Sequence, residues 1–332
     1  GSTFHLHSKF CTGCALGKST QLPFSINKNY APSLFYLIHY DMWMSHVTSV
    51  TGFRYYVLFT DEYSRYSWIY PMHRKSEVFS HFQKFVAMVK NIFGTSVKHL
   101  QSDNGTEYVN TSFTTFCHSL GIQQRFPCPH TPQQNGLVDR KHRHISTMTR
   151  ILLTTSHMPL NLWVEAALTS VHLINLLPTP VLNWSTPYTV LFSKPPTYSH
   201  LRVFGCSCFP FLGPYVNHKL LSRSLECVFI GYSLHHKGYR CLHPSTGRVY
   251  TSRHVIFNED CFPFIQLQVS SSSPYVALDL SPLPAVLLPP PPVAHLPIDP
   301  MQPLSPSGSP LEPVSLVPAC QLTPVGPTSS TA

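Results

Sequence analysis

The order of its hydrophobic patterns constrains the fold of this chain most. Between residues 34 and 102, three apolar runs typical of buried strands are followed by a helical pattern and then by another apolar run. The strand-like runs cover residues 34–40, 55–60, 66–70 and 97–102. Strands, a helix and a further strand indicate an α/β domain in which helices cover a sheet.

The helix between the third and fourth runs has recognisable ends. Ser76 is the expected N-cap, the apolar residues from Val78 to Phe93 follow helical spacing, and Gly94 is the expected C-cap. We expect this helix to pack on the core of the domain. We also expect Pro71 to stop the strand that precedes it.

Further elements are predicted toward residue 260. They are a short helix over 113–120, a strand over 121–126, a long helix from Gly136 with a buried stripe through Val138 and Ile145, and a helix over 160–177. After residue 200, short strands separated by turns predict a small β-barrel or meander over 201–208, 226–233, 238–243 and 249–257. The four cysteines in these strands are expected to be buried thiols rather than a second zinc site.

Charge is sparse, at 11% of residues, but it is distributed unevenly. Residues 1–273 contain all 23 basic residues and only 11 of the 14 acidic ones, a net charge of +12, which favours a polyanionic partner. Residues 274–332 contain 16 of the 32 prolines, and we expect a disordered Pro-rich tail there. Because no apolar run reaches the roughly 18–20 residues of a membrane span, we expect a soluble, intracellular protein with no membrane partner.

Cys11 and Cys14 have the spacing of a metal-binding pair. Two thiolates separated by two residues can hold one Zn²⁺ from a tight turn, but a tetrahedral site needs four ligands. His5 and His7 lie too close before the first cysteine for an ordinary zinc finger. We expect the cysteine pair to be half of a zinc site whose other ligands lie upstream of this sequence.

Three aspartates, Asp41, Asp103 and Asp139, are the candidates for catalysis. The first two follow predicted strands and the third lies in the long helix, so a shared sheet edge can bring them together. Converging carboxylates are what paired divalent cations about 3.5–4 Å apart require. The helix also has a polar face suited to a metal ion and phosphates, with Asp139, Arg143, Ser146 and Arg150 at helical offsets.

Several linked motifs resemble copia-type retrotransposon integrases over residues 10–265. The first are Cys11-Thr-Gly-Cys14-Ala-Leu-Gly-Lys18, Ser102-Asp-Asn-Gly-Thr-Glu-Tyr108 and His130-Thr-Pro-Gln-Gln-Asn-Gly136. Others, in the same order as in the family, are Trp163-x-Glu165-Ala166, Leu201-Arg-Val-Phe-Gly-Cys206 and Phe229-Ile-Gly-Tyr232.

The resemblance implies a ribonuclease H-like integrase core, a mixed five-stranded sheet with flanking helices, followed by a small all-β domain. We accordingly expect four parts along the chain. They are a remnant of a His/Cys zinc-binding module (1–25), the catalytic core with a helical extension (26–195), a small β-barrel-like domain (196–265) and the disordered Pro-rich tail (266–332).

The resemblance also implies a metal-dependent polynucleotidyl transferase that processes the ends of element DNA and joins their 3′-hydroxyls to target DNA. Asp41, Asp103 and Asp139 are expected to bind Mg²⁺ or Mn²⁺, and Zn²⁺ is expected if the upstream ligands exist. The expected partners are element and target DNA and further copies of the chain, on a route from a virus-like particle in the cytoplasm to the nucleus. The expected DNA contacts, whose alternative is a solvated surface, are Gln134, Asn135, Arg140, Lys141, Arg143 and Arg150.

This sequence departs from the family pattern near two of the aspartates. Asp139 stands where the family has Glu, and the missing methylene withdraws the carboxylate by roughly 1.5 Å. Met42-Trp43-Met44 replaces an aromatic-Gly-Pro turn after Asp41. Because a misplacement near 1 Å can cost on the order of 10²-fold in rate, the alternative is a DNA-binding relic with impaired catalysis. A ribonuclease of the same fold is a third alternative, although no fourth carboxylate or RNA-specific contact supports it.

Overall fold

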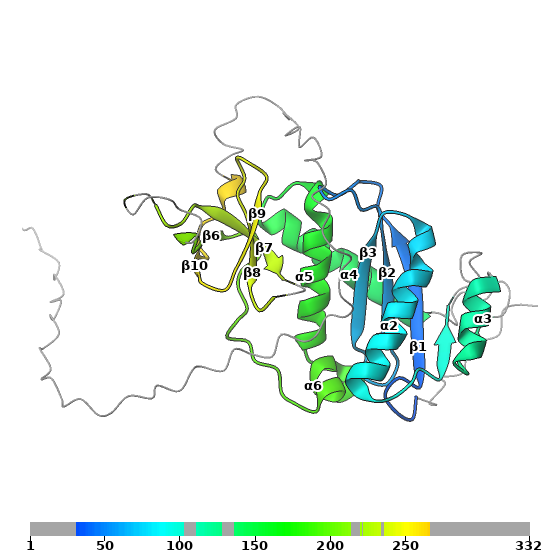
Figure 1. The fold of residues 1–332 in the computed structure, drawn as a ribbon. Helices are drawn as coiled ribbons and strands as arrows, with labels where there is room; N and C mark the ends of the chain where they lie inside the picture. Colours follow the sequence, from blue (N-terminus) through cyan, green and yellow to red (C-terminus); the bar gives the residue numbers. More distant parts are fainter. Residues whose placement is uncertain are drawn as a thin grey trace, which may run out of the picture.

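A computed structural model of the chain describes residues 31–102, 111–127, 136–213, 220, 222–233 and 236–265 (Figure 1). The first half is built on a five-stranded mixed sheet of order β3-β2-β1-β4-β5. β1, β2 and β3 are antiparallel neighbours, whereas β4 and β5 continue the sheet in parallel with β1. The strands are β1 (Leu37–Met44), β2 (Tyr55–Asp61), β3 (Ser67–Met72), β4 (His99–Gln101) and β5 (Gln123–Arg125).

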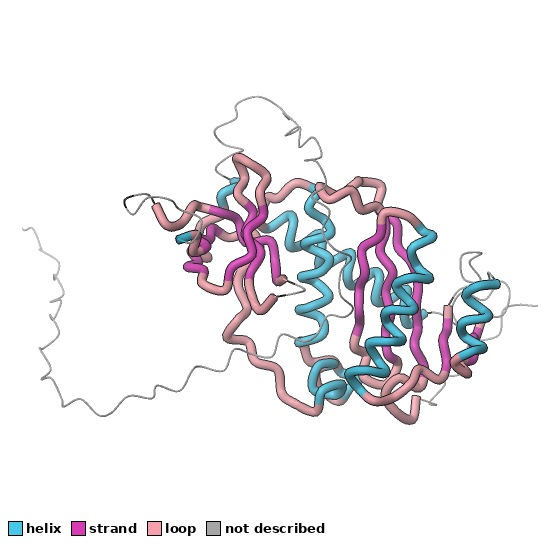
Figure 2. The backbone as a smooth tube through the Cα atoms, viewed as in Figure 1, coloured by secondary structure: helices cyan, strands magenta, loops and turns pink. Residues whose placement is uncertain are grey.

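Helices cover both faces of this sheet (Figure 2). α2 (Val78–Phe93) follows the short 3-10 turn η1 (Lys75–Glu77) and packs on one face, near α3 (Thr111–Ser119). α4 (Gly136–Thr155) and α5 (Trp163–Leu176) cover the other face. The connections contain η4 (Leu160–Leu162), η5 (Pro180–Leu182) and α6 (Pro187–Phe192).

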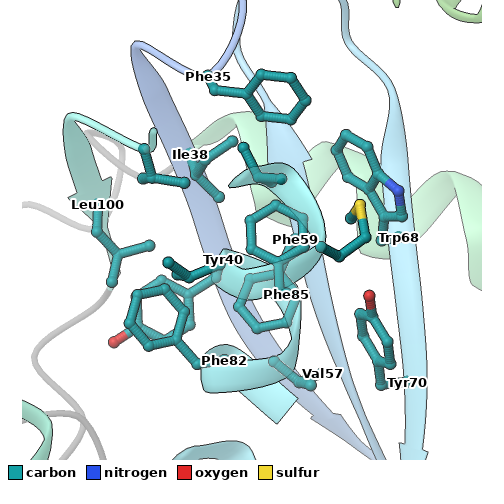
Figure 3. Packing of buried hydrophobic residues seen from close by; sticks show 14 of the residues in the cluster. Phe35, Ile38, Tyr40, Val57, Phe59, Trp68, Tyr70, Phe82, Phe85 and Leu100 are labelled. Carbon is teal, nitrogen blue, oxygen red and sulfur yellow. The ribbon is translucent and has the colours of Figure 1, made fainter. Parts of the chain in front are cut away.

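The face under α2 is an aromatic core (Figure 3). Tyr40 from β1 and Phe59 from β2 lie against Phe82 and Phe85 of α2, and the rings of Phe59 and Phe85 stack with their centroids 4.6 Å apart. α2 ends at Gly94, which adopts the left-handed conformation (φ 64°) that favours glycine at a helix C-cap. The predicted core-facing helix is therefore confirmed, together with its C-terminal end.

The opposite face of the sheet packs on α4 and α5, and this cluster continues into the β domain. Tyr56 and Leu58 of β2 share one hydrophobic cluster with Trp163 of α5 and with Val228 and Ile230 of the second sheet. α5 thus lies between the core sheet and the β domain (Figure 1). The segment Leu160–Leu182 is long and apolar enough to cross a membrane by length and composition alone, but its apolar part is mostly buried inside the protein, so this packing accounts for its apolarity.

The β domain is an antiparallel five-stranded sheet of order β10-β6-β7-β8-β9. Its strands are β6 (Ser207–Pro210), β7 (Cys227–Tyr232), β8 (Tyr239–Leu242), β9 (Val249–Ser252) and β10 (Val255–Asn258). Its small core contains four cysteines as fully buried free thiols, namely Cys206 just before β6, and Cys208, Cys227 and Cys241 within the strands. Within the described residues no group of three or more His, Cys, Asp or Glu side chains could hold a metal ion.

The β domain approaches α5 closely. Gly231 of β7 has φ +112°, and a Cβ atom there would lie 2.5 Å from Oγ1 of Thr169 in α5, so only glycine fits. Beside this contact, Arg240 of β8 lies with its Nη2 atom 3.4 Å from the Oε1 atom of buried Glu165 in α5. Burial raises the pKa of Glu165, and the nearby Arg240 partly offsets this rise.

Three details of the predicted core elements are wrong. β1 does not end at Asp41, because its pairing with β2 continues to Met44 opposite Tyr55. β3 runs through Pro71, which is tolerated because β3 is an edge strand and needs no N–H there. Ser76 is not the N-cap, because the helical turn begins earlier, after Arg74.

The predicted strands of the β domain also need correction. The strand predicted over 249–257 is two strands, because the chain turns between Ser252 and His254. The Ser252 hydroxyl stabilises this turn by donating to the carbonyl of His254 and accepting from its N–H. The strand predicted from residue 201 begins only at Ser207. Gly205 explains the delay, since it has φ +83° and packs directly against Ser156 at the end of α4.

Candidate active site

Asp41 lies on the α4 side of β1, the side opposite the aromatic core. Its neighbours in the strand, Tyr40 and Met42, point into the aromatic cluster, so the alternation of the strand directs Asp41 toward α4. The side chain is 19% exposed. Its Oδ1 atom accepts a hydrogen bond of 2.7 Å from the backbone N–H of Met42, which fixes one edge of the carboxylate.

The other edge of the carboxylate faces His142 of α4. The Nε2 atom of His142 lies 3.4 Å from Oδ2 of Asp41, and the imidazole is 10% exposed. His142 continues the buried stripe of α4 between Val138 and Ile145. His142 is not among the residues predicted from the sequence, although a polar residue at a core position of a predicted helix is a detectable signal.

Tyr56 of β2 lies on the far side of the imidazole. Its hydroxyl oxygen is 3.0 Å from Nδ1 of His142, and the two rings lie 5.4 Å apart. Burial, and secondarily the charge of Asp41, raise the pKa of Tyr56, whereas a hydrogen bond from Ser146 acts in the opposite direction. Ser146, predicted to lie on a face for metal and phosphate, is therefore near enough to this tyrosine to lower its pKa.

An aromatic wall borders these polar groups. Trp43 of β1 stacks on Tyr56 with ring centroids 5.2 Å apart and meets Trp163 of α5 edge-on at 5.5 Å. The indole Nε1 of Trp163 donates to the carbonyl of Val47 at 2.9 Å. The Met42-Trp43-Met44 segment that departs from the family pattern therefore extends β1 and packs, instead of turning.

Asp139 lies in the first turn of α4 and is exposed to solvent. It precedes His142 by three residues. Asp139 and the imidazole that contacts Asp41 therefore lie one turn apart on the same helix. The structure thus brings Asp41 to the N-terminal turns of α4. Asp103 lies outside the described residues, as do Cys11, Cys14, Gln134 and Asn135.

The predicted basic contacts on α4 differ in exposure. Arg140, Arg143 and Arg150 are exposed, whereas Lys141 is partly buried. Burial, together with the charge of Arg65, lowers the pKa of Lys141 to about 8. Lys141 is therefore the predicted contact that differs most in its surroundings from an ordinary surface lysine.

Asp61, which directly follows the predicted strand over 55–60, has a structural role. It is fully buried at the end of β2, where Oδ1 accepts from the Phe35 N–H at 2.9 Å and Oδ2 accepts from the N–H and hydroxyl of Ser64 at 2.8 and 2.7 Å. Both oxygens are occupied by the chain itself. Burial raises the pKa of Asp61 despite these bonds.

Two regions of the chain match known protein families. Residues 34–132 match the family described as Integrase core domain. Residues 206–270 match the Retroviral polymerase SH3-like domain. These matches cover the core sheet and the β domain respectively.

Similar proteins are plant retrotransposon polyproteins. The chain is 43% identical over 312 residues to the Retrovirus-related Pol polyprotein from transposon RE2 of Arabidopsis thaliana, a match that covers 90% of this chain and 21% of that protein. It is 36% identical over 252 residues to the corresponding polyprotein from transposon TNT 1-94 of Nicotiana tabacum, covering 76% of this chain and 19% of the relative. The chain therefore spans about a fifth of the length of these relatives.

Solved structures of viral integrases are also similar. The simian T-cell lymphotropic virus intasome, in complex with the PP2A regulatory subunit B56 gamma, shares 19% identity at a TM-score of 0.43, covering 73% of this chain and 84% of that chain. The HTLV-2 integrase catalytic core domain in complex with magnesium shares 18% identity at a TM-score of 0.37, covering 48% of this chain and 98% of that chain.

The sheet order, its helices and the two family matches define an integrase, with a ribonuclease H-like core followed by an SH3-like β domain. The predicted fold class, a mixed five-stranded sheet with flanking helices followed by a small β domain, is confirmed. More narrowly, the chain belongs to the integrase region of copia-type retrotransposon Pol polyproteins. The family recognised from the sequence motifs is therefore confirmed as well.

Proposed function

We propose that this chain is the DNA-joining part of its polyprotein, a metal-dependent polynucleotidyl transferase that processes element DNA ends and joins their 3′-hydroxyls to target DNA. The observation that carries the proposal is the contact of Asp41 with α4. Its Oδ2 atom lies 3.4 Å from Nε2 of His142, and His142 is one helical turn from Asp139. Two predicted active-site carboxylates, ninety-eight residues apart in sequence, thus belong to neighbouring elements in space.

The register of the parallel strands supports a role for Asp103. His39 of β1 pairs with Gln101, the last residue of β4. Asp41 is two residues after His39, and Asp103 is two residues after Gln101. Equal offsets from a parallel pair favour a common position along the two chains.

The donor set suits a hard divalent cation. Mg²⁺ and Mn²⁺ prefer carboxylate oxygens, and Asp41 and Asp139 supply such oxygens beside the N-terminal turns of α4. The ions would activate a water or a 3′-hydroxyl and stabilise the leaving oxygen during attack on phosphate. The chain itself contributes a half-buried, hydrogen-bonded Asp41 and a more exposed Asp139.

Exposed arginines on α4 support binding to phosphates near this site. Arg140, Arg143 and Arg150 lie on the solvent side of the helix that contacts Asp41. Positive charge of this kind supplies affinity for the DNA backbone without reading the base sequence. We assign Lys141, Gln134 and Asn135 to the same DNA surface.

Several companion proposals follow from the family. We propose element ends and target DNA as partners, assembly of several copies on DNA, and passage from cytoplasm to nucleus. We also keep the predicted domain boundaries, 1–25, 26–195, 196–265 and 266–332, and a zinc site completed upstream of Cys11 and Cys14.

One observation favours a second function, a DNA-binding relic. Asp139 is a methylene shorter than the Glu of the family and points from an exposed helical turn, so it reaches less far toward an ion at Asp41. The fold and the basic surface would persist in such a relic while catalysis is lost.

Strand joining with and without Mg²⁺ tests both functions. The recombinant chain and Asp139→Glu are incubated with a labelled duplex that carries the terminal sequence of the same element and with plasmid target DNA. We expect Mg²⁺-dependent joined product, raised in Asp139→Glu, because Mg²⁺ at about 2.0–2.1 Å tolerates little slack in ligand distance. Product only in Asp139→Glu supports the relic. Absence of product in both chains, with DNA binding intact, contradicts the proposed reaction.

A further inference from the structure

His142 has an unusual combination of burial and incomplete hydrogen bonding. Its Nε2 atom is buried and has no hydrogen-bond partner among the residues that the structure describes. A buried ring nitrogen without a partner costs free energy, so such atoms call for an explanation. The charged oxygen beside it is Oδ2 of Asp41, at 3.4 Å, from which a small ring rotation would make a hydrogen bond.

The protonation of the ring follows from its other nitrogen. Because burial raises the pKa of Tyr56, its hydroxyl remains protonated and can donate to Nδ1 of His142, 3.0 Å away. When Nδ1 accepts, the proton of the neutral imidazole resides on Nε2, the atom that faces Asp41.

We propose that His142 is a positioning residue, which holds the Asp41 carboxylate through its Nε2–H while Tyr56 fixes the tautomer of the ring. This inference rests on the proposed function, since Asp41 is the group whose position matters for ion binding. The Met42 N–H holds Oδ1 and the imidazole holds Oδ2. Each carboxylate oxygen keeps a further lone pair for an ion, and such outer partners typically tune metal affinity.

A competing role for His142 is direct ligation of a metal through Nε2. That role requires the proton on Nδ1, because a ligating nitrogen must be free of hydrogen. The tautomer therefore separates the two roles.

The tautomer can be measured in the metal-free chain. ¹⁵N-histidine labelling, with the His142 signals assigned by their loss in His142→Gln, gives the shifts of both ring nitrogens. We expect Nε2 protonated and Nδ1 unprotonated, and a loss of this preference in Tyr56→Phe. A proton on Nδ1 of the wild-type ring would overturn the proposal and indicate a ligand role instead.

The positioning effect is measured by Mn²⁺ affinity, using electron paramagnetic resonance of free Mn²⁺. We expect His142→Ala to weaken Mn²⁺ binding by about 10–100-fold, the usual cost of removing an outer partner of a metal ligand. His142→Gln should restore most of the loss, because its side-chain amide places an N–H at a reach similar to that of Nε2. His144→Ala, in an exposed position of the same helix, is the matched control and should bind as the wild type does.

The outcomes separate this inference from the proposed function. Wild-type affinity in His142→Ala, or no recovery in His142→Gln when both variants melt at the wild-type temperature, overturns the positioning role. Mn²⁺ binding that is equal in wild type and Asp41→Asn contradicts the proposed metal site instead. The tautomer measurement still decides the role of His142 in that case, because it needs no metal ion.

Discussion

The two faces of the core sheet are made by the same strands, yet their side chains differ in chemistry. Under α2, Tyr40 and Phe59 belong to a cluster made almost entirely of aromatic and aliphatic groups. On the α4 face, Asp41 and Tyr56 alternate with them and meet His142. The pleat of β1 and β2 thus separates groups that stabilise the fold from groups available for chemistry.

This difference teaches where substitutions should be felt. Changes on the α2 face remove packing and should lower the free energy of unfolding, whereas changes at Asp41 should alter activity with little effect on unfolding. α5 complicates the division, because it buries a charged residue, Glu165, against the β domain.

Asp41→Asn should have the largest effect. We expect Mg²⁺-dependent strand joining to fall by about 10³-fold or more, equivalent to about 4 kcal/mol of transition-state stabilisation. Asparagine keeps the shape and the acceptor for the Met42 N–H, so the urea midpoint should stay near that of the wild type. A loss of activity that is matched by a loss of folded protein would break the division between the faces.

Phe59→Ala should act on stability instead. Removal of a fully buried ring that stacks on Phe85 should cost about 3–5 kcal/mol in the free energy of unfolding, measured by urea denaturation. Phe59→Leu, which leaves a smaller cavity, should lose less. The folded fraction of Phe59→Leu should join DNA at the wild-type rate, and a specific loss of joining would show that the aromatic face also supports chemistry.

Glu165→Gln should change how stability depends on pH. Because burial raises the pKa of Glu165, the folded chain takes up its proton before the unfolded chain does as the pH falls. Wild type should therefore gain stability relative to Glu165→Gln between pH 7 and the unfolded carboxyl pKa of about 4.3. The urea midpoints of both proteins are measured at pH 7 and at pH 4.5. If the difference in midpoint between wild type and Glu165→Gln is the same at both pH values, the raised pKa of Glu165 is contradicted.

Arg143→Ala should have a smaller effect, confined to DNA binding. Loss of one phosphate contact should reduce the slope of log affinity against log salt concentration by about 0.9. Arg74→Ala, exposed at the start of η1 beside α2, is the control and should leave the slope unchanged. Equal slopes for all three proteins would mean that the α4 face does not contact phosphates.

Deletion of residues 274–332 should have the smallest effect. This segment contains no Lys or Arg and carries three acidic residues, so DNA affinity should not fall when it is removed. Fluorescence anisotropy with a short duplex measures the affinity. Loss of binding in the truncated chain would assign the tail a role in the fold or in assembly.

Much of the core could be predicted from the sequence because local signals and tertiary packing agree there. The spacing of α2 and its Gly94 end are local features, and the structure preserves both. The end of β1 was mispredicted because a charge at Asp41 resembles a strand end, whereas pairing with β2 and packing of Trp43 continue the strand. Pro71 was mispredicted because an edge position cannot be read from one strand alone.

The candidate site was only partly predictable. The order of the predicted strands and helices identified Asp41 and Asp139, but the imidazole between Asp41 and Tyr56 depends on contacts across eighty-six residues, which no local pattern contains. Asp61 also follows a predicted strand, but its carboxylate accepts hydrogen bonds from Phe35 and Ser64 of its own fold. Asp41 and Asp61 are therefore distinguished by their partners in the folded structure and not by residue type.

Anomalous diffraction from Mn²⁺-soaked crystals tests the central claim most directly, namely that Asp41, Asp103 and Asp139 form one metal site on the α4 face of the sheet. We expect anomalous peaks within coordination distance of all three carboxylates. Since two ions span only about 4 Å, any one of these carboxylates lying more than about 10 Å from the other two would contradict a shared site.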